Sequence, residues 1–157
     1  MMPAYRRGFL LVALATLVTD QVTKALMTAW LLPRGGFTVI PGLFDLTYVK
    51  NRGAVFGLFG GLGDPWRGVV LTFVPLGAIV LVAVLAWRSP AGRASPLLPL
   101  ALVLGGAVGN LIDRLRLGAV VDFLDWHLAG HHWPAFNVAD SAICVGVGFL
   151  LLHSFRS

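Results

Sequence analysis

Four stretches of the chain are long and apolar enough to predict helices that cross a membrane. A helix needs about 20 mostly apolar residues to span a bilayer. Runs of this kind occur at residues 8–32, 68–87, 96–112 and 139–155. The first run contains Asp20 and Lys24, and only four bulky apolar residues precede Ala13, too few for the core of a cleaved signal peptide. We therefore expect four retained transmembrane helices.

The two longer connections between these runs have patterns of their own. In residues 36–48, apolar positions are divided by Pro41-Gly42, which is typical of a strand, a turn and a second strand. Residues 113–138 combine aspartate, histidine and tryptophan, which predicts a short helix or loop at the membrane interface. With 33–67 and 113–138 outside the bilayer, the predicted fold is one domain over residues 1–157. It is an all-α membrane protein with four transmembrane helices, a small β-rich extracytoplasmic flap and a short interfacial helix or loop.

Arginines near the helix ends predict the orientation. Four helices place both termini on one side of the membrane, and that side carries Arg6, Arg7, Arg88, Arg93 and Arg156. Short loops rich in Lys and Arg face the cytoplasm. The opposite side has six Lys or Arg in longer segments, where this rule weakens, so the prediction depends on the short Arg88–Arg93 loop. Both termini are predicted to be cytoplasmic.

Composition supports a membrane protein and limits its partners. The chain is 57% hydrophobic and 12% charged, with a mean hydropathy of +0.83, whereas soluble domains average about 25% charged residues. The single cysteine excludes a disulfide scaffold. Basic residues are scattered, so the net charge of +5 favours membrane lipids over nucleic acid. All seven acidic residues are Asp, although Glu is the better helix former, so few acids merely decorate exposed helix faces.

Three of the predicted helices place polar side chains at a similar depth. Measured from the cytoplasmic helix ends, Asp20, Asn110 and Asp140 lie about 20, 21 and 24 Å along their helices. In a hydrocarbon core of about 30 Å, all three fall in the outer third. Charged groups within a membrane segment face the bundle interior and mark functional sites. Asp20 and Lys24, four residues apart on one helix face, can also be read as a structural ion pair.

Asp122 and Asp140 are harder to explain as structural residues than Asp113. Asp113 and Arg114 have a simple reading as a helix end at headgroup level, but Asp122 is flanked by apolar residues on both sides. Asp140 lies in the first turn of the last predicted helix, where an acid alone would complement the helix dipole. If Asp122 and Asp140 meet, the pair holds a single proton. One carboxyl can then act as general base on water while the other polarises a peptide carbonyl.

Two other classes of function are open at this point. His127 and His131 have the spacing of a helical metal pair, but Gly130 makes the region loop-like and there is no H-E-x-x-H motif. We expect no metal and leave the role of His127, His131 and His132 open. The second class is a transporter or proton-coupled carrier, because intramembrane charges also line ion paths. Against it, the cytoplasmic halves of the predicted helices are nearly free of charge.

Five motifs, in order along nearly the whole chain, resemble those of the bacterial prolipoprotein (type II) signal peptidases. They are D-Q-V-T-K from Asp20, N-R-G-A-V-F-G from Asn51, G-N-L-I-D-R from Gly109, V-V-D-F from Val120 and F-N-V-A-D-S from Phe136. The stretch at 54–57 departs slightly from the family's commoner Ala-Ala-Phe-Ser form.

The resemblance implies a membrane aspartic endopeptidase without a cofactor, whose catalytic pair is Asp122 and Asp140. Its substrate would be a diacylglyceryl-modified bacterial prolipoprotein, cleaved on the amino side of the lipidated cysteine. The enzyme would lie in the cytoplasmic (inner) membrane with its active site near the extracytoplasmic face. The residues implied to bind substrate or to support the catalytic pair are Asn51, Asn110, Arg114, Asn137, Asp20, Lys24 and Asp113.

Overall fold

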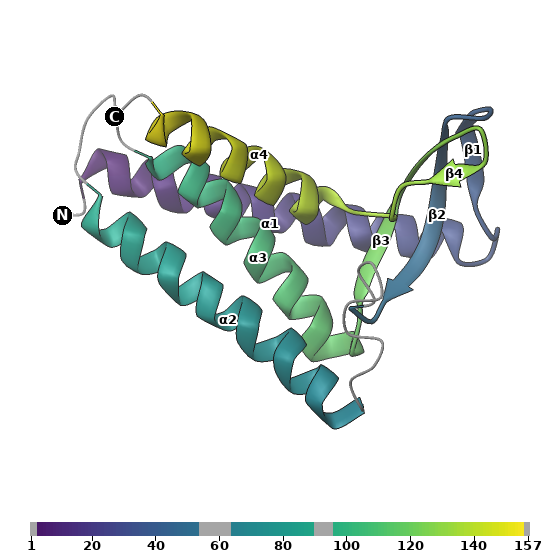
Figure 1. Cartoon of the computed structure of the whole chain (residues 1–157), viewed down its shortest axis with the longest axis horizontal. Helices are drawn as coiled ribbons and strands as arrows, with labels where there is room; N and C mark the ends of the chain where they lie inside the picture. Colours follow the sequence, from purple (N-terminus) through teal and green to yellow (C-terminus); the bar gives the residue numbers. More distant parts are fainter. Residues whose placement is uncertain (1–2, 54–63, 90–95, 156–157) are drawn as a thin grey trace.

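Four helices form an up-and-down bundle that carries a β-sheet at one end (Figure 1). The structure, a computed structural model, describes residues 3–53, 64–89 and 96–155. The helices are α1 (Ala4–Leu31), α2 (Asp64–Arg88), α3 (Leu97–Leu117) and α4 (Val138–Ser154). They match the four predicted runs, although α1 and α2 each begin four residues earlier and α3 ends later. Residues 54–57 of the second motif, and Arg93 and Arg156 of the orientation argument, lie outside the described residues.

The helices have the length and surface of a multi-pass membrane protein. Residues Ala4–Leu31, Val69–Arg88 and Leu97–Leu117 are long and apolar enough to cross a membrane, and α4 is a shorter apolar helix of 17 residues. Large apolar side chains such as Leu11, Val74 and Leu152 are more than half exposed. A bundle that exposes such side chains along its length is suited to lipid rather than to water.

Helix α3 is the centre of the bundle and contacts α1, α2 and α4. Small residues permit this close approach. A β-carbon at Gly105 would lie 2.7 Å from Cβ of Thr16 on α1, and one at Gly106 would lie 2.6 Å from the carbonyl oxygen of Ala139 on α4. Glycine at these positions therefore brings α1 and α4 directly against α3.

Four antiparallel strands form the sheet in the order β1-β2-β3-β4. They are β1 (Phe37–Ile40), β2 (Phe44–Asn51), β3 (Val120–Leu128) and β4 (His131–His132). The predicted β1–β2 hairpin is confirmed, with Gly42 at a positive φ of 76° in its turn. The all-α prediction was wrong in this respect, because the protein is mixed and mostly helical.

The prediction of a short interfacial helix or loop within 113–138 was also wrong. Helix α3 continues to Leu117 and ends at Gly118, which adopts a left-handed conformation (φ 66°). The chain then enters β3 and pairs with β2. Val120, Val121, Asp122 and Phe123 are all buried, so the start of this strand lacks the alternation of apolar and polar residues that identifies strands in a sequence.

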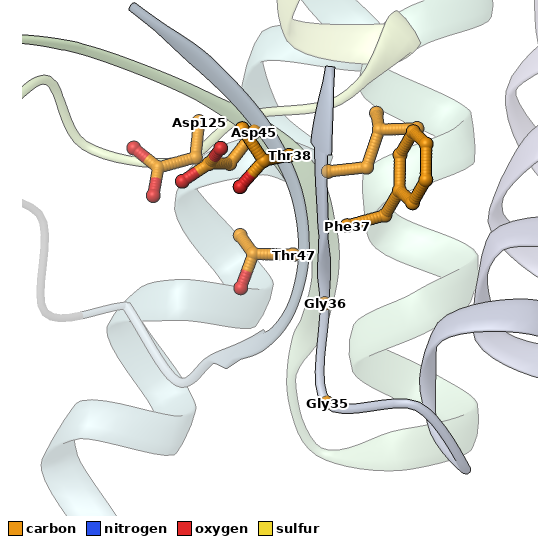
Figure 2. A pocket seen from close by; sticks show the side chains of 8 residues that line it. Gly35, Gly36, Phe37, Thr38, Asp45, Thr47 and Asp125 are labelled. Atoms are coloured by element: carbon orange, nitrogen blue, oxygen red, sulfur yellow. The ribbon is translucent and has the colours of Figure 1, made fainter. Parts of the chain in front are cut away.

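The sheet has one polar face and one more apolar face. Figure 2 shows Thr38, Asp45, Thr47 and Asp125 on one side, with Phe37 pointing to the other. Because side chains alternate along a strand, Asp122 of β3 shares its face with Leu124 and Trp126 rather than with Asp125. Trp126 stacks against Phe44 of β2 at a centroid distance of 4.7 Å. Asp122 therefore lies on the face that carries these aromatic rings.

Candidate active site

Asp122 is buried on β3, with 1% of its surface exposed, and two side-chain amides bind it. Asn51 Nδ2 donates to Oδ2 at 2.9 Å, and Asn137 Nδ2 donates to Oδ1 at 2.6 Å. The pairing of β2 with β3 brings Asn51 to this position. The pKa of Asp122 is raised to about 6, chiefly by burial and also by the negative charge of Asp140, while the hydrogen bonds from the two amides oppose the shift.

Asp140 lies in the first turn of α4 and forms a capping box with Asn137. The backbone N–H of Asp140 donates to Asn137 Oδ1 at 2.9 Å, and the backbone N–H of Asn137 donates to Asp140 Oδ2 at 3.3 Å. The same Asn137, which is fully buried, also binds Asp122. A single asparagine therefore connects the two aspartates that the sequence analysis paired.

Lys24 fixes the orientation of the amide that binds Asp140. Its ammonium donates to Asn110 Oδ1 at 2.8 Å, and an ammonium has only donors. Asn110 must therefore turn its Nδ2 away from Lys24, and that group donates to Asp140 Oδ1 at 2.7 Å. Asn137 Nδ2 also approaches Asn110 Oδ1, at 3.2 Å. A continuous chain of hydrogen bonds thus runs from Lys24 to both candidate aspartates.

Two more buried carboxylates surround Lys24. The predicted Asp20–Lys24 ion pair is present at 2.9 Å, and Asp113 joins it at 3.0 Å. All three residues are at most 4% exposed. The reading of Asp113 as a headgroup-level helix end is therefore wrong, because its carboxylate points into the bundle.

Arg114 is half-buried beside the candidate pair. Within the described ranges, its guanidinium forms no hydrogen bond or ion pair, but its charge interacts with Asp113, Asp122 and Asp140. With Arg114 included, the structure gathers every predicted site residue around the junction of α1, α3, α4 and the paired strands β2 and β3.

Sequence reasoning missed Gln21 of α1. Its Nε2 donates to Asp20 Oδ2 at 3.1 Å, to the carbonyl oxygen of Gly109 at 3.2 Å and to Asp113 Oδ1 at 3.1 Å. The one signal in the sequence was a polar residue in an apolar helix, three positions before Lys24 and therefore on the same face.

The three histidines whose role the sequence left open, His127, His131 and His132, belong to the sheet. His127 contacts Asp45 at 3.1 Å, and His132 contacts Asp125 at 2.9 Å. The helical spacing behind the metal alternative is absent, because His127 and His131 lie on different strands. Among the described side chains, no group of three His, Cys or Asp is arranged to hold a metal ion.

A cavity of about 260 Å³ lies on the polar face of the sheet (Figure 2). It is lined by Gly35, Gly36, Phe37, Thr38, Asp45, Leu46, Thr47 and Asp125. Asp122 projects from the other face of β3, so this cavity is separate from the paired aspartates.

Comparisons with known proteins agree on one family. Residues 12–156 match the family described as signal peptidase (SPase) II. The chain is 48% identical to a lipoprotein signal peptidase of Syntrophotalea carbinolica, covering 96% of this chain and 92% of that protein. It is 44% identical to one of Geobacter metallireducens, covering 99% and 94%.

A solved structure of a bacterial membrane enzyme is similar to this one. Its TM-score is 0.77 and its sequence identity 28%, over 95% of this chain and 88% of that one. The agreement of sequence and fold, together with the gathered motif residues, shows that the chain belongs to the lipoprotein signal peptidase (signal peptidase II) family.

Proposed function

We propose that Asp122 and Asp140 are the catalytic pair with which this peptidase removes the signal peptide of diacylglyceryl-modified bacterial prolipoproteins. The cut falls on the amino side of the lipidated cysteine. The observation that carries this proposal is the sharing of Asn137 by the two aspartates. In addition, burial raises the pKa of Asp122 to about 6, which favours a pair that holds one proton near neutral pH.

The chemistry follows from one proton shared between two carboxyl groups. The ionised aspartate takes a proton from water as the oxygen attacks the scissile carbonyl, and the protonated aspartate donates to the carbonyl oxygen. The intermediate then collapses as its C–N bond breaks: the proton taken from water passes to the leaving amine, and one hydroxyl of the intermediate returns its proton to the other aspartate, so the pair again holds one proton. Three amides hold the carboxylates in place, those of Asn51, Asn110 and Asn137. Arg114 binds the substrate, because its guanidinium forms no hydrogen bond or ion pair within the described ranges.

The proposed membrane arrangement has four spans and cytoplasmic termini. Helix α4 has 17 residues, which corresponds to about 26 Å, enough to cross most of the hydrocarbon core. The first turn of α1 and the last turn of α4 lie at the end of the bundle opposite the sheet (Figure 1). Arg6 and Arg88 lie at that same end, where Arg6 contacts the ring of Trp87 at 4.1 Å. These basic residues support cytoplasmic termini and, with them, a sheet and an aspartate pair near the extracytoplasmic face.

In this arrangement the aromatic face of the sheet meets the outer leaflet. Phe37 and Trp126 on that face are about half exposed, and Trp30 at the end of α1 packs against Phe37 with tilted rings at a centroid distance of 5.2 Å. Aromatic rings favour the membrane interface. A substrate helix with its diacylglyceryl group would reach Asp122 from the lipid along this face.

The test uses two matched substrates and the full-length protein in detergent. One is a prolipoprotein peptide with a diacylglyceryl-modified cysteine, and the other is the same peptide without lipid. We expect cleavage of the lipidated peptide alone, before the cysteine, with the Asp140→Asn variant as the inactive control. Equal cleavage of both peptides would remove the lipid specificity from the proposal.

A further inference from the structure

The two carboxylates beside Lys24 each hold the backbone immediately before one candidate catalytic aspartate. Asp20 Oδ1 accepts the backbone N–H of Ala139 at 2.9 Å, and Ala139 precedes Asp140. Asp113 Oδ2 accepts the backbone N–H of Val121 at 3.1 Å, and Val121 precedes Asp122. The position of each candidate catalytic residue thus depends on a different supporting carboxylate.

Only two side chains join these supporting carboxylates within the described part of the chain. Lys24 contacts Asp20 at 2.9 Å and Asp113 at 3.0 Å, and Gln21 Nε2 lies 3.1 Å from an oxygen of each. The three groups around Nε2, including the carbonyl of Gly109, are all acceptors, so the amide nitrogen rather than its oxygen faces them.

Charge alone does not hold the two carboxylates together. Asp20 and Asp113 bring two negative charges to one lysine, and like charges in a buried site repel strongly. Gln21 supplies additional hydrogen donors to both carboxylates without adding charge. The ammonium of Lys24 has three hydrogens and already donates them to Asp20, Asp113 and Asn110. Gln21 therefore supplies hydrogen bonds to the two carboxylates that Lys24 cannot.

We propose that Gln21 is a positioning residue for the reaction, because it clasps Asp20 to Asp113 and thereby sets the separation of Asp122 from Asp140. The proposal rests on the proposed function of the aspartate pair. Gln21 does not touch the reacting atoms. Without it, Asp20 and Asp113 separate, the backbone of α4 and that of β3 follow, and the two candidate catalytic carboxyls move apart.

Three variants of the full-length protein in detergent test this role. Gln21→Met keeps the side-chain length but removes the donors. Gln21→Glu can donate only when the new carboxyl is protonated. Val18→Ala is the matched control, because Val18 lies on the same helix with half of its surface exposed. Folding is checked by thermal unfolding, and kcat and KM are measured with the lipidated peptide across pH.

For Gln21→Met we expect kcat to fall by about 10- to 100-fold with little change in KM, since small displacements of reacting groups have effects of this size. The pH range of activity should also narrow, because two carboxyls that lie farther apart share a proton less strongly. Gln21→Glu should recover activity as the pH falls. A purely structural role would alter stability without changing the width of the pH profile.

Wild-type kcat and profile width in Gln21→Met, or loss of folded protein in both Gln21 variants, would overturn the positioning role. That failure is distinguishable from failure of the proposed function. If Asp122→Asn or Asp140→Asn still turns over substrate, the catalytic pair itself is wrong. If those variants are inactive while Gln21→Met is unaffected, only the role of Gln21 is wrong.

Discussion

Replacing Lys24 by Met should destabilise the protein severely, because it leaves two buried carboxylates without their positively charged partner. Lys24 is 3% exposed and contacts Asp20 and Asp113 at 2.9 and 3.0 Å. At these distances and an effective dielectric constant of about 20, each pair gains about 5–6 kcal/mol of Coulomb energy. Desolvation offsets much of this gain, and removing one partner of a buried pair costs about 3–5 kcal/mol. We expect a loss of that size for Lys24→Met.

Equilibrium unfolding in mixed SDS and detergent micelles measures this loss. Lys50→Met, at an exposed position on β2, is the matched control and should change the free energy of unfolding by less than about 0.5 kcal/mol. Adding Asp113→Asn to Lys24→Met removes one stranded charge and should restore about 1–2 kcal/mol. A loss below about 1 kcal/mol for Lys24→Met, or no restoration in the double variant, would refute the reasoning that the cluster is buried and ionised.

Three further predictions concern pH, packing and metals. The pKa of Asp122 rises on folding from 3.8 to about 6, so the free energy of unfolding should fall by about 3 kcal/mol as the pH rises from about 3 to about 7. Asp122→Asn should lose this pH dependence, and equal slopes in the two proteins would contradict it. A β-carbon at Gly109 would collide with Asp20, 3.1 Å from its Cγ, so Gly109→Ala should lower kcat by about tenfold or more. Gly148→Ala, with nothing within 4 Å, should be neutral, and equal activities would contradict the packing argument. Chelators should leave cleavage unchanged; inhibition reversed by added zinc would point to a metal.

The depth argument from the sequence brought the right helices together. Asp20, Asn110 and Asp140 were placed at one level by counting residues from the helix ends, and the structure links them through Lys24. The depth argument succeeded because a helix rises by a constant distance per residue, and because polar groups in lipid must face one another. The hairpin of β1 and β2 was equally visible, since Pro41 and the glycine after it mark a turn.

The sheet around Asp122 could not be predicted in the same way. Strand β3 is buried on both faces where it begins, and its partner β2 is far away in the chain. Only the register shows that Asn51 comes to Asp122 and that Asp45 lies opposite Asp125. Local patterns do not contain such long-range pairings.

Gln21 was missed for a related reason. Within α1 it is an ordinary polar residue beside an ion pair, and its partners on α3 are 88 and 92 residues away. Nor could the backbone hydrogen bonds that Asp20 and Asp113 accept be foreseen from their positions in the sequence. Residues that support a site through the backbone leave little trace in a sequence pattern.

The most direct test of the account is turnover of the lipidated prolipoprotein peptide by Asp122→Asn and Asp140→Asn, each purified in detergent and shown to be folded by its unfolding transition. Asparagine keeps the size of aspartate but can neither take up nor release the proton, and its NH2 group donates where a carboxylate oxygen accepted. The account predicts that each variant binds the peptide and cleaves none of it. Full turnover by either folded variant would contradict the assignment of the catalytic pair.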